Sequence, residues 1–289
     1  GKGGIDMQSE TKNGLNILHI ACIHNNTSFC QALVKMNNEL KLPLGKADLQ
    51  GWNIAHFAAK VGNKDVFNNF IDEEFASQKT LQEKTVLHIC CEYGHYELCK
   101  FILKDSSFIG AILHDVDDEG WNALHYAAKG GNLKLFKMIE ETLKSSDTLE
   151  VLCEETHYQE TVLHICCIHK NVDICSYICN KLPKIVNNPS TNLWTAAHYV
   201  AVEIKQDGSE EKLIDILVEA GIDLESESKH GKTVLTVAFE HRNDKLIDYL
   251  LTHHIDLVKI NTPKLREATA HNKIYEEKLQ KALQKVKSP

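Results

Sequence analysis

The sequence predicts an all-α solenoid of about seven helix-turn-helix repeats with hairpin connections, plus a helix that caps its carboxyl end. Two observations support this fold class. A short motif centred on a histidine recurs along the chain at intervals of 32 to 39 residues, and each copy is followed by a pair of apolar residues at helical spacing. We therefore expect one helical hairpin to be repeated and stacked into a continuous core.

The recurring motif places a Thr or Asn three residues before the anchor position, and small residues directly after it. Thr and Asn are good helix N-caps, and small residues let neighbouring helices approach closely. The motif thus predicts the first helix of each repeat. The anchors are His19, His56, His88, His125, His164, His198 and, in the seventh copy, Thr236.

The second helix of each repeat is predicted from an apolar pair that follows the anchor. Such a pair gives the helix one face that packs on the adjacent repeat. A single repeat cannot bury this face alone, so stability should come from stacking. The pairs are Phe29/Cys30, Val66/Phe67, Leu98/Cys99, Leu135/Phe136, Ile174/Cys175, Leu213/Ile214 and Leu246/Ile247.

These residues resemble the ankyrin repeat, whose core is Thr-Pro-Leu-His-x-Ala-Ala followed by Gly and a second helix. The resemblance covers residues 11–260. It departs from the family pattern because no copy keeps the Pro and the inter-helix Gly survives only as Gly62, Gly94 and Gly131. The resemblance implies a non-catalytic protein-binding array that needs no cofactor.

Three segments follow from this assignment. Residues 1–10 are an N-terminal cap or a cloning remnant, residues 11–260 are the repeat domain, and residues 261–289 are a helical cap. Within the cap, Leu265, Ala268, Ile274, Leu279, Leu283 and Val286 lie at approximate helical spacing. A basic partner-binding helix is the alternative, because this tail carries a net charge of +4.

Composition excludes several functional classes. The formal net charge is -8, which argues against a nucleic-acid binder, since such proteins need a basic face. The sequence has neither a run of about 18 apolar residues nor a signal-peptide pattern, so we expect a cytoplasmic protein without a membrane span in this fragment.

The histidines and cysteines have a structural explanation. His88 with Cys90 and Cys91, and His164 with Cys166 and Cys167, do not match the ligand spacing of a structural zinc site, so no metal is expected. Nine of the ten Cys occupy positions where other repeats have Ala, Val, Phe or Leu, which predicts buried, reduced thiols. Cys153 lies in a linker instead. A catalytic centre is not indicated either, because the anchor histidine recurs in six repeats. The family resemblance implies that it hydrogen-bonds a hairpin backbone.

Odd and even repeats differ, which indicates a unit of two repeats. All three Trp of the chain lie four residues before the anchor of an even repeat, at Trp52, Trp121 and Trp194. The resemblance puts this position at the hairpin-to-helix junction on the concave side. The neighbouring residues predicted there are Lys60, Val61, Tyr93, Lys129, His169 and Glu203. The three Trp are either anchors for a partner or packing residues between hairpins.

Two functions therefore stay open: a protein-interaction scaffold that binds a partner on its concave face, and the cytosolic regulatory array of a larger protein such as an ankyrin-bearing ion channel. Lys60 and Lys129 favour a partner with acidic side chains, and the row of three Trp favours an extended or helical segment. We expect a monomer, with longer linkers around residues 35–46 and 141–157 and an insertion near residues 206–210 as further candidates for specificity.

Overall fold

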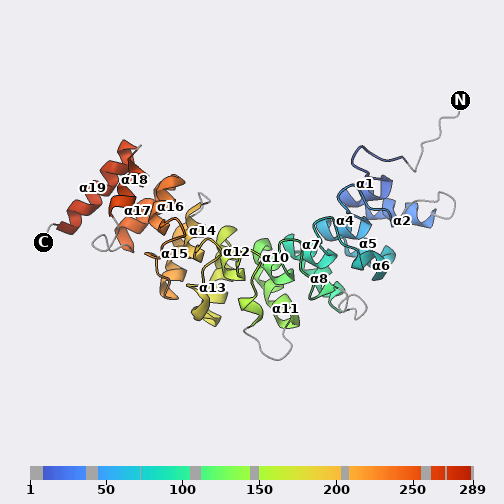
Figure 1. The fold of residues 1–289 in the computed structure, drawn as a ribbon. Coiled ribbons are helices and arrows are strands. Elements are labelled where there is room, and N and C mark those ends of the chain that lie inside the picture. The colour runs from blue at the N-terminus through green and yellow to red at the C-terminus, as the bar shows by residue number, and fades with distance from the viewer. Residues whose placement is uncertain are drawn as a thin grey trace. The chain divides into compact units, whose positions relative to one another are not determined.

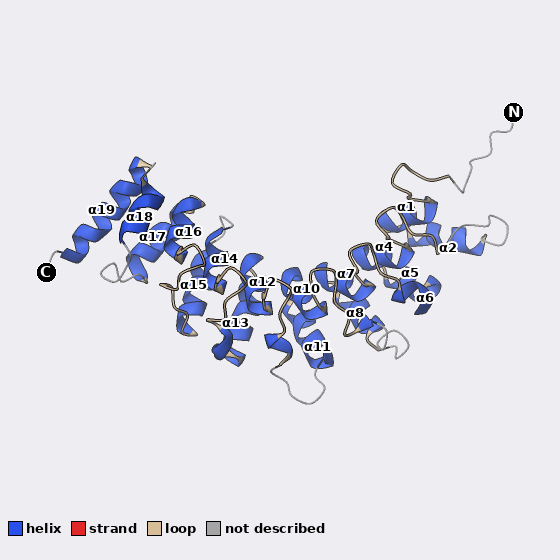
Figure 2. Ribbon diagram, viewed as in Figure 1, coloured by secondary structure: helices blue, strands red, loops and turns tan. Residues whose placement is uncertain are grey.

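The computed structural model consists of helix pairs joined by turns and loops (Figures 1 and 2), and it describes residues 9–36, 45–71, 73–104, 112–143, 150–202, 208–254, 262–270 and 272–287. The described residues contain helices and no strand, as the sequence predicts. The chain divides into two compact units, residues 1–151 and residues 152–289. None of the helices in the described ranges has the length and apolar character that a membrane span requires.

The first unit holds four helix pairs. Its first helices pack against one another in order, α1 on α4, α4 on α7 and α7 on α10, while the second helices α2, α5, α8 and α11 form a parallel row. The bounds are α1 (Ile17–Ile23), α2 (Thr27–Lys35), α4 (Ile54–Val61), α5 (Lys64–Phe70), α6 (Glu73–Ser77), α7 (Val86–Glu92), α8 (Tyr96–Ile102), α10 (Ala123–Gly130) and α11 (Leu133–Leu143).

The second unit holds three further pairs and the carboxyl-terminal helices. Here α12 packs on α14 and α14 on α16, while α13 packs on α15 and α15 on α17. The bounds are α12 (Val162–Ile168), α13 (Val172–Lys181), α14 (Ala196–Val202), α15 (Ser209–Glu219), α16 (Val234–Glu240), α17 (Asp244–His253), α18 (Thr262–Thr269) and α19 (Lys273–Lys287), with a short 3₁₀ turn η2 (Pro183–Ile185). A second 3₁₀ turn, η1 (Val151–Cys153), includes the last residue of the first unit and the first two of the second.

In six of the seven repeats the Thr or Asn of the motif is the N-cap of the first helix. In repeat two the Asn53 side chain accepts hydrogen bonds from the backbone N–H groups of Ala55 and His56, at 2.9 and 3.1 Å. A second hydrogen bond runs in the opposite direction: Nδ1 of the His56 ring accepts from the Asn53 backbone N–H at 3.1 Å. This reciprocal arrangement is a capping box with histidine in the place usually taken by Glu or Gln.

The other ring nitrogen of the anchor histidine holds the hairpin that leads into the next repeat. Since Nδ1 is an acceptor, Nε2 carries the proton and donates it to a backbone carbonyl. The prediction that the anchor bonds a hairpin backbone is thus confirmed in five repeats. The acceptors are the carbonyls of Lys46 for His19 (3.0 Å), Gln78 for His56 (3.1 Å), Asp115 for His88 (3.1 Å), Asn188 for His164 (3.0 Å) and Lys232 for His198 (2.9 Å).

The apolar pairs of the second helices lie in the core of each unit. Val66, Leu98 and Leu135 are at most 1% exposed, as are their partners Phe67 and Phe136. Phe29 is the exception at 40% exposed, because no earlier repeat covers it among the described residues. Burying a side chain of this size contributes roughly 1.5 to 3 kcal/mol, so stacking is the main source of stability.

The carboxyl-terminal segment forms two helices where the sequence predicted one. α18 ends at Thr269, and α19 begins at Lys273 after Asn272, whose side chain accepts a hydrogen bond from the Ile274 backbone N–H at 3.1 Å. Leu265 on α18 and Leu279 on α19 are buried, whereas Ile274 is 64% exposed. α18 packs on α16 of the last repeat.

The linkers predicted at residues 35–46 and 141–157 and the insertion predicted at residues 206–210 each fall partly outside the described residues, and α15 begins within the insertion at Ser209. Nine of the ten cysteines are buried and Cys153 is partly exposed, as predicted from the repeat positions.

Candidate partner-binding surface

The residues predicted for partner binding gather at the two ends of the first helices. Trp52 and Trp121 each precede an N-cap, and Trp194 lies two residues before α14. Lys60, Val61 and Lys129 lie in last helical turns, and Tyr93 and His169 are C-caps. His169 and Trp194 belong to the second unit and the other six to the first. Glu203 lies outside the described residues.

The three tryptophans are half-buried and contact the same two kinds of ring in each even repeat. In repeat four the Trp121 ring centroid lies 6.2 Å from that of His125 and 5.3 Å from that of Tyr126. The corresponding distances are 6.0 and 5.3 Å for Trp52 with His56 and Phe57, and 5.7 and 5.1 Å for Trp194 with His198 and Tyr199. Each Trp therefore has a packing role inside its own repeat.

The aromatic residue that follows the anchor histidine links each even repeat to the repeat before it. Phe57 lies 5.2 Å from the His19 ring, Tyr126 lies 5.2 Å from the His88 ring, and Tyr199 lies 5.7 Å from the His164 ring. A series of four rings thus runs through every two-repeat unit. The sequence analysis missed this position, although an aromatic residue occupies it in all three even repeats and Ile occupies it in repeats one, three and five.

Both lysines predicted for this surface, Lys60 and Lys129, lie over these aromatic rings in the first unit. The Lys60 ammonium is 5.6 Å from the Trp52 centroid and 5.8 Å from that of Tyr93, which is within cation–π range. Tyr93 is 46% exposed and stacks on the His95 ring at 6.3 Å. Trp52, Lys60 and Tyr93 thereby form a partly exposed cluster across repeats two and three, which we call the Lys60 cluster.

The second lysine, Lys129, has an ionic partner as well as aromatic ones. Its ammonium lies 5.9 Å from the ring centroids of both Trp121 and Tyr126. It also forms a salt bridge of 2.6 Å with Glu92. Glu92 forms a second salt bridge, with Lys84, at 3.5 Å. Glu92 therefore offsets part of the positive charge that the sequence places beside Trp121.

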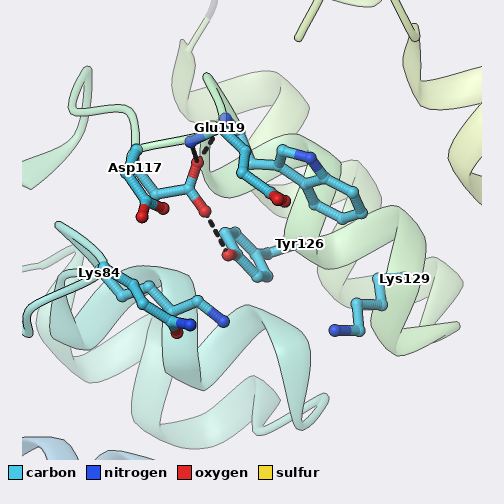
Figure 3. A pocket seen from close by; sticks show the side chains of 8 residues that line it. Lys84, Asp117, Glu119, Tyr126 and Lys129 are labelled. Atoms are coloured by element: carbon cyan, nitrogen blue, oxygen red, sulfur yellow. Dashed lines mark hydrogen bonds between the residues drawn. The ribbon is translucent and has the colours of Figure 1, made fainter. Parts of the chain in front are cut away.

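A pocket of ≈ 140 Å³ opens beside Lys129 (Figure 3). Asp117 lines the pocket and holds three other groups in place. Its carboxylate accepts hydrogen bonds from the Tyr126 hydroxyl at 2.5 Å and from the backbone N–H groups of Trp121 and Glu119 at 2.8 and 3.0 Å. Burial, together with this bond to a carboxylate, raises the pKa of Tyr126. The pocket is lined by Gln82, Lys84, Asp117, Asp118, Glu119, Trp121, Tyr126 and Lys129.

This arrangement suits the binding of a polar side chain more than chemistry on a substrate. Lys84 and Lys129 lie on either side of the Tyr126 ring, whose face the Lys84 ammonium approaches to 4.9 Å (Figure 3). Cations, an aromatic wall and the acidic residues Asp118 and Glu119 can each make ionic or hydrogen-bonded contacts with a partner.

Comparison with known proteins agrees with the repeat assignment. A family model described as ankyrin repeats (3 copies) matches residues 3–79, 56–144 and 109–189. The chain is 28% identical over 156 residues to the human transient receptor potential cation channel subfamily A member 1, which covers 50% of this chain and 12% of that protein. It is also 28% identical over 174 residues to the ankyrin repeat protein FPV022 of fowlpox virus, covering 58% of this chain and 26% of that protein.

An ankyrin repeat-containing protein of Arabidopsis thaliana is 27% identical over 93 residues, covering 30% of this chain and 17% of that protein. The matched segments thus span about a quarter or less of these relatives. The family model alone covers more than half of the chain, and the helix pairs described above have the family's architecture. The chain therefore belongs to the ankyrin-repeat family, whose members are typically non-enzymatic and whose repeats generally mediate protein–protein interaction.

Proposed function

We propose that this array binds a protein partner on the concave face, through the ends of its first helices and the hairpin junctions. The observation that carries the proposal is the Lys60 cluster, in which a cation and two aromatic rings are held together yet remain partly exposed. Side chains that are fixed before binding lose little conformational entropy on association. Aromatic residues are also the commonest energetic anchors of interfaces.

The contact residues proposed in the first unit are Trp52, Lys60, Val61, Tyr93, Trp121 and Lys129, and those in the second unit are His169 and Trp194. An acidic or extended helical segment is the proposed partner, because Lys60 lies over aromatic rings at the exposed ends of α4 and α7. Lys129 contributes less to this attraction, since Glu92 already contacts it. We further propose that the protein is cytoplasmic, monomeric and without catalytic activity.

The wider context proposed as an alternative is a regulatory array within a larger protein such as an ion channel. The similarity to the human transient receptor potential cation channel supports it, together with the small share of that protein that this chain spans. In that setting the partner surface would contact another part of the same assembly. The coding sequence that flanks this segment distinguishes the two settings, because a channel subunit would add apolar membrane spans.

The experiment is affinity capture with the whole chain as bait, followed by binding kinetics for the captured protein. Lys60→Glu should slow association and reduce its dependence on salt, because it reverses a charge beside the proposed interface. Lys100→Glu is the matched control, since it makes the same change at an exposed position of the second helix α8. Equal effects of the two substitutions would contradict the proposed surface.

A further inference from the structure

Sulfur atoms are concentrated in the odd-numbered repeats, and their number rises along the chain. Repeat one has Cys22 and Cys30 with their Sγ atoms 3.7 Å apart, and repeat three has Cys90, Cys91 and Cys99. Repeat five has four cysteines: Cys166, Cys167, Cys175 and Cys179. Within the described residues, only repeat five brings three potential ligand atoms within 4.8 Å of one another.

Packing alone does not require these sulfurs. Cys166 and Cys167 lie two and three residues after the anchor His164 of repeat five. The equivalent residues of repeat four are Ala127 and Ala128. All four residues are at most 1% exposed. Small apolar side chains therefore fill the same space in a neighbouring repeat, and the thiols add metal-binding chemistry that alanine lacks.

The geometry of the repeat-five thiols is close to that of a three-sulfur metal site. Cys166 and Cys167 come from α12 and Cys175 from α13, and the Sγ atoms of Cys167 and Cys175 are 3.9 Å apart. Metal–thiolate bonds of about 2.3 Å in a planar trigonal site place the sulfurs about 4.0 Å apart. All three thiols are fully buried, so the site would exclude water.

Positive charge near the cluster would compensate the thiolates that a metal needs. Lys170, which is 5% exposed, donates hydrogen bonds from Nζ to the carbonyls of Val200 at 2.6 Å and Tyr199 at 3.2 Å. A metal ion would have to displace the proton of each thiol that it binds as a thiolate.

We propose that Cys166, Cys167 and Cys175 of repeat five form a binding site for a single soft d¹⁰ cation, Cu(I). Thiolate sulfur selects Cu(I), and Cu(I) accepts three-coordinate geometry. Each Cys that bonds to the ion as a thiolate releases one proton to solvent, and no electron is transferred. The Cys179 thiol, which interacts with Cys175, lies beside the three ligands.

The test is anaerobic competition for Cu(I) between the whole reduced chain and a chromophoric Cu(I) chelator. Cys153→Ala is included in every protein, because that thiol is partly exposed and would bind Cu(I) on its own. The parent should withdraw one equivalent of Cu(I) from the chelator and release protons as it does so. The double variant Cys166→Ala/Cys167→Ala copies the sequence of repeat four and should lose that equivalent.

The matched control is Cys90→Ala/Cys91→Ala, which removes the same Cys-Cys pair from the same positions of repeat three. It should retain the bound equivalent, and circular dichroism should show both double variants folded. Equal loss from the two double variants, or no Cu(I) withdrawn by the parent, would overturn the proposal. Preference for Zn²⁺ with a requirement for Cys179 would overturn the three-sulfur assignment, because four thiolates make a tetrahedral zinc site.

Discussion

Acid should unfold individual repeats through their anchor histidines. Burial lowers the pKa of His56 and His88 from 6.5 to about 4, although the hairpin carbonyls that each ring contacts oppose this effect. In the unfolded chain the same rings take up a proton near pH 6.5. The folded pKa is the lower one, so the stabilising contribution is complete above pH 6.5 and is lost as the pH falls toward 4.

The size of the effect follows from the two pKa values. At pH 5.0 the unfolded state gains about 2 kcal/mol for each ring relative to the folded state, and the limit below pH 4 is about 3 kcal/mol. A loss of this size is large against the stability of a typical domain.

Hydrogen exchange measured helix by helix between pH 7.5 and 5.0 is the appropriate assay, because repeat arrays unfold in parts. Amides of α4 and α7 should lose protection, after correction for the intrinsic pH dependence of exchange. Repeat seven has no anchor histidine of its own, since Thr236 replaces it and bonds the Thr233 hydroxyl at 3.1 Å, so α16 depends only on His198 of repeat six and should lose less protection than α7. His88→Thr should make α7 less stable at pH 7.5 but insensitive to pH. Equal acid sensitivity in α7 and α16 would refute the reasoning.

Three further predictions concern other contacts. Tyr126→Phe removes the hydrogen bond to Asp117 and should lower the free energy of unfolding of repeat four by about 1 kcal/mol, measured by urea denaturation. Unchanged hydrogen-exchange protection in α16 is the control. Deleting residues 262–289 removes the 5.4 Å contact between Tyr275 and Phe239 and should reduce hydrogen-exchange protection in α16, while protection in α4 stays unchanged. If α16 is protected equally in the truncated and the whole chain, α18 and α19 do not cap the last repeat. Cys153 should be alkylated first in a brief iodoacetamide pulse followed by mass mapping, because the other thiols are buried, and faster labelling of any core Cys would contradict the predicted burial.

Much of the fold could be predicted because the information is local. The N-cap, the anchor histidine and its small neighbours lie within a few residues of one another, and the motif recurs often enough to set the repeat register. The bond from His88 to the Asp115 carbonyl was expected from the family resemblance, since the hairpin has a fixed place after each helix pair. Burial of the core cysteines followed from comparing equivalent positions.

Features that depend on contacts between repeats were harder to predict. Lys129 and Glu92 are 37 residues apart and meet only because α7 packs on α10, so no local pattern reveals that Glu92 offsets the lysine's charge. The contact between His88 and Tyr126 has the same origin. The break between α18 and α19 was missed because the apolar spacing continues across it, although Asn272 is a recognisable N-cap.

The role of the Lys60 cluster in partner binding is tested most directly by the affinity of Tyr93→Ala for the captured partner, with the unfolding midpoint of the variant measured in parallel. Tyr93 is 46% exposed and belongs to the Lys60 cluster, so its removal should affect binding more than folding. We expect Tyr93→Ala to weaken the binding free energy by about 1 to 4 kcal/mol, with a nearly unchanged unfolding midpoint. Parental affinity for Tyr93→Ala would contradict the proposed surface.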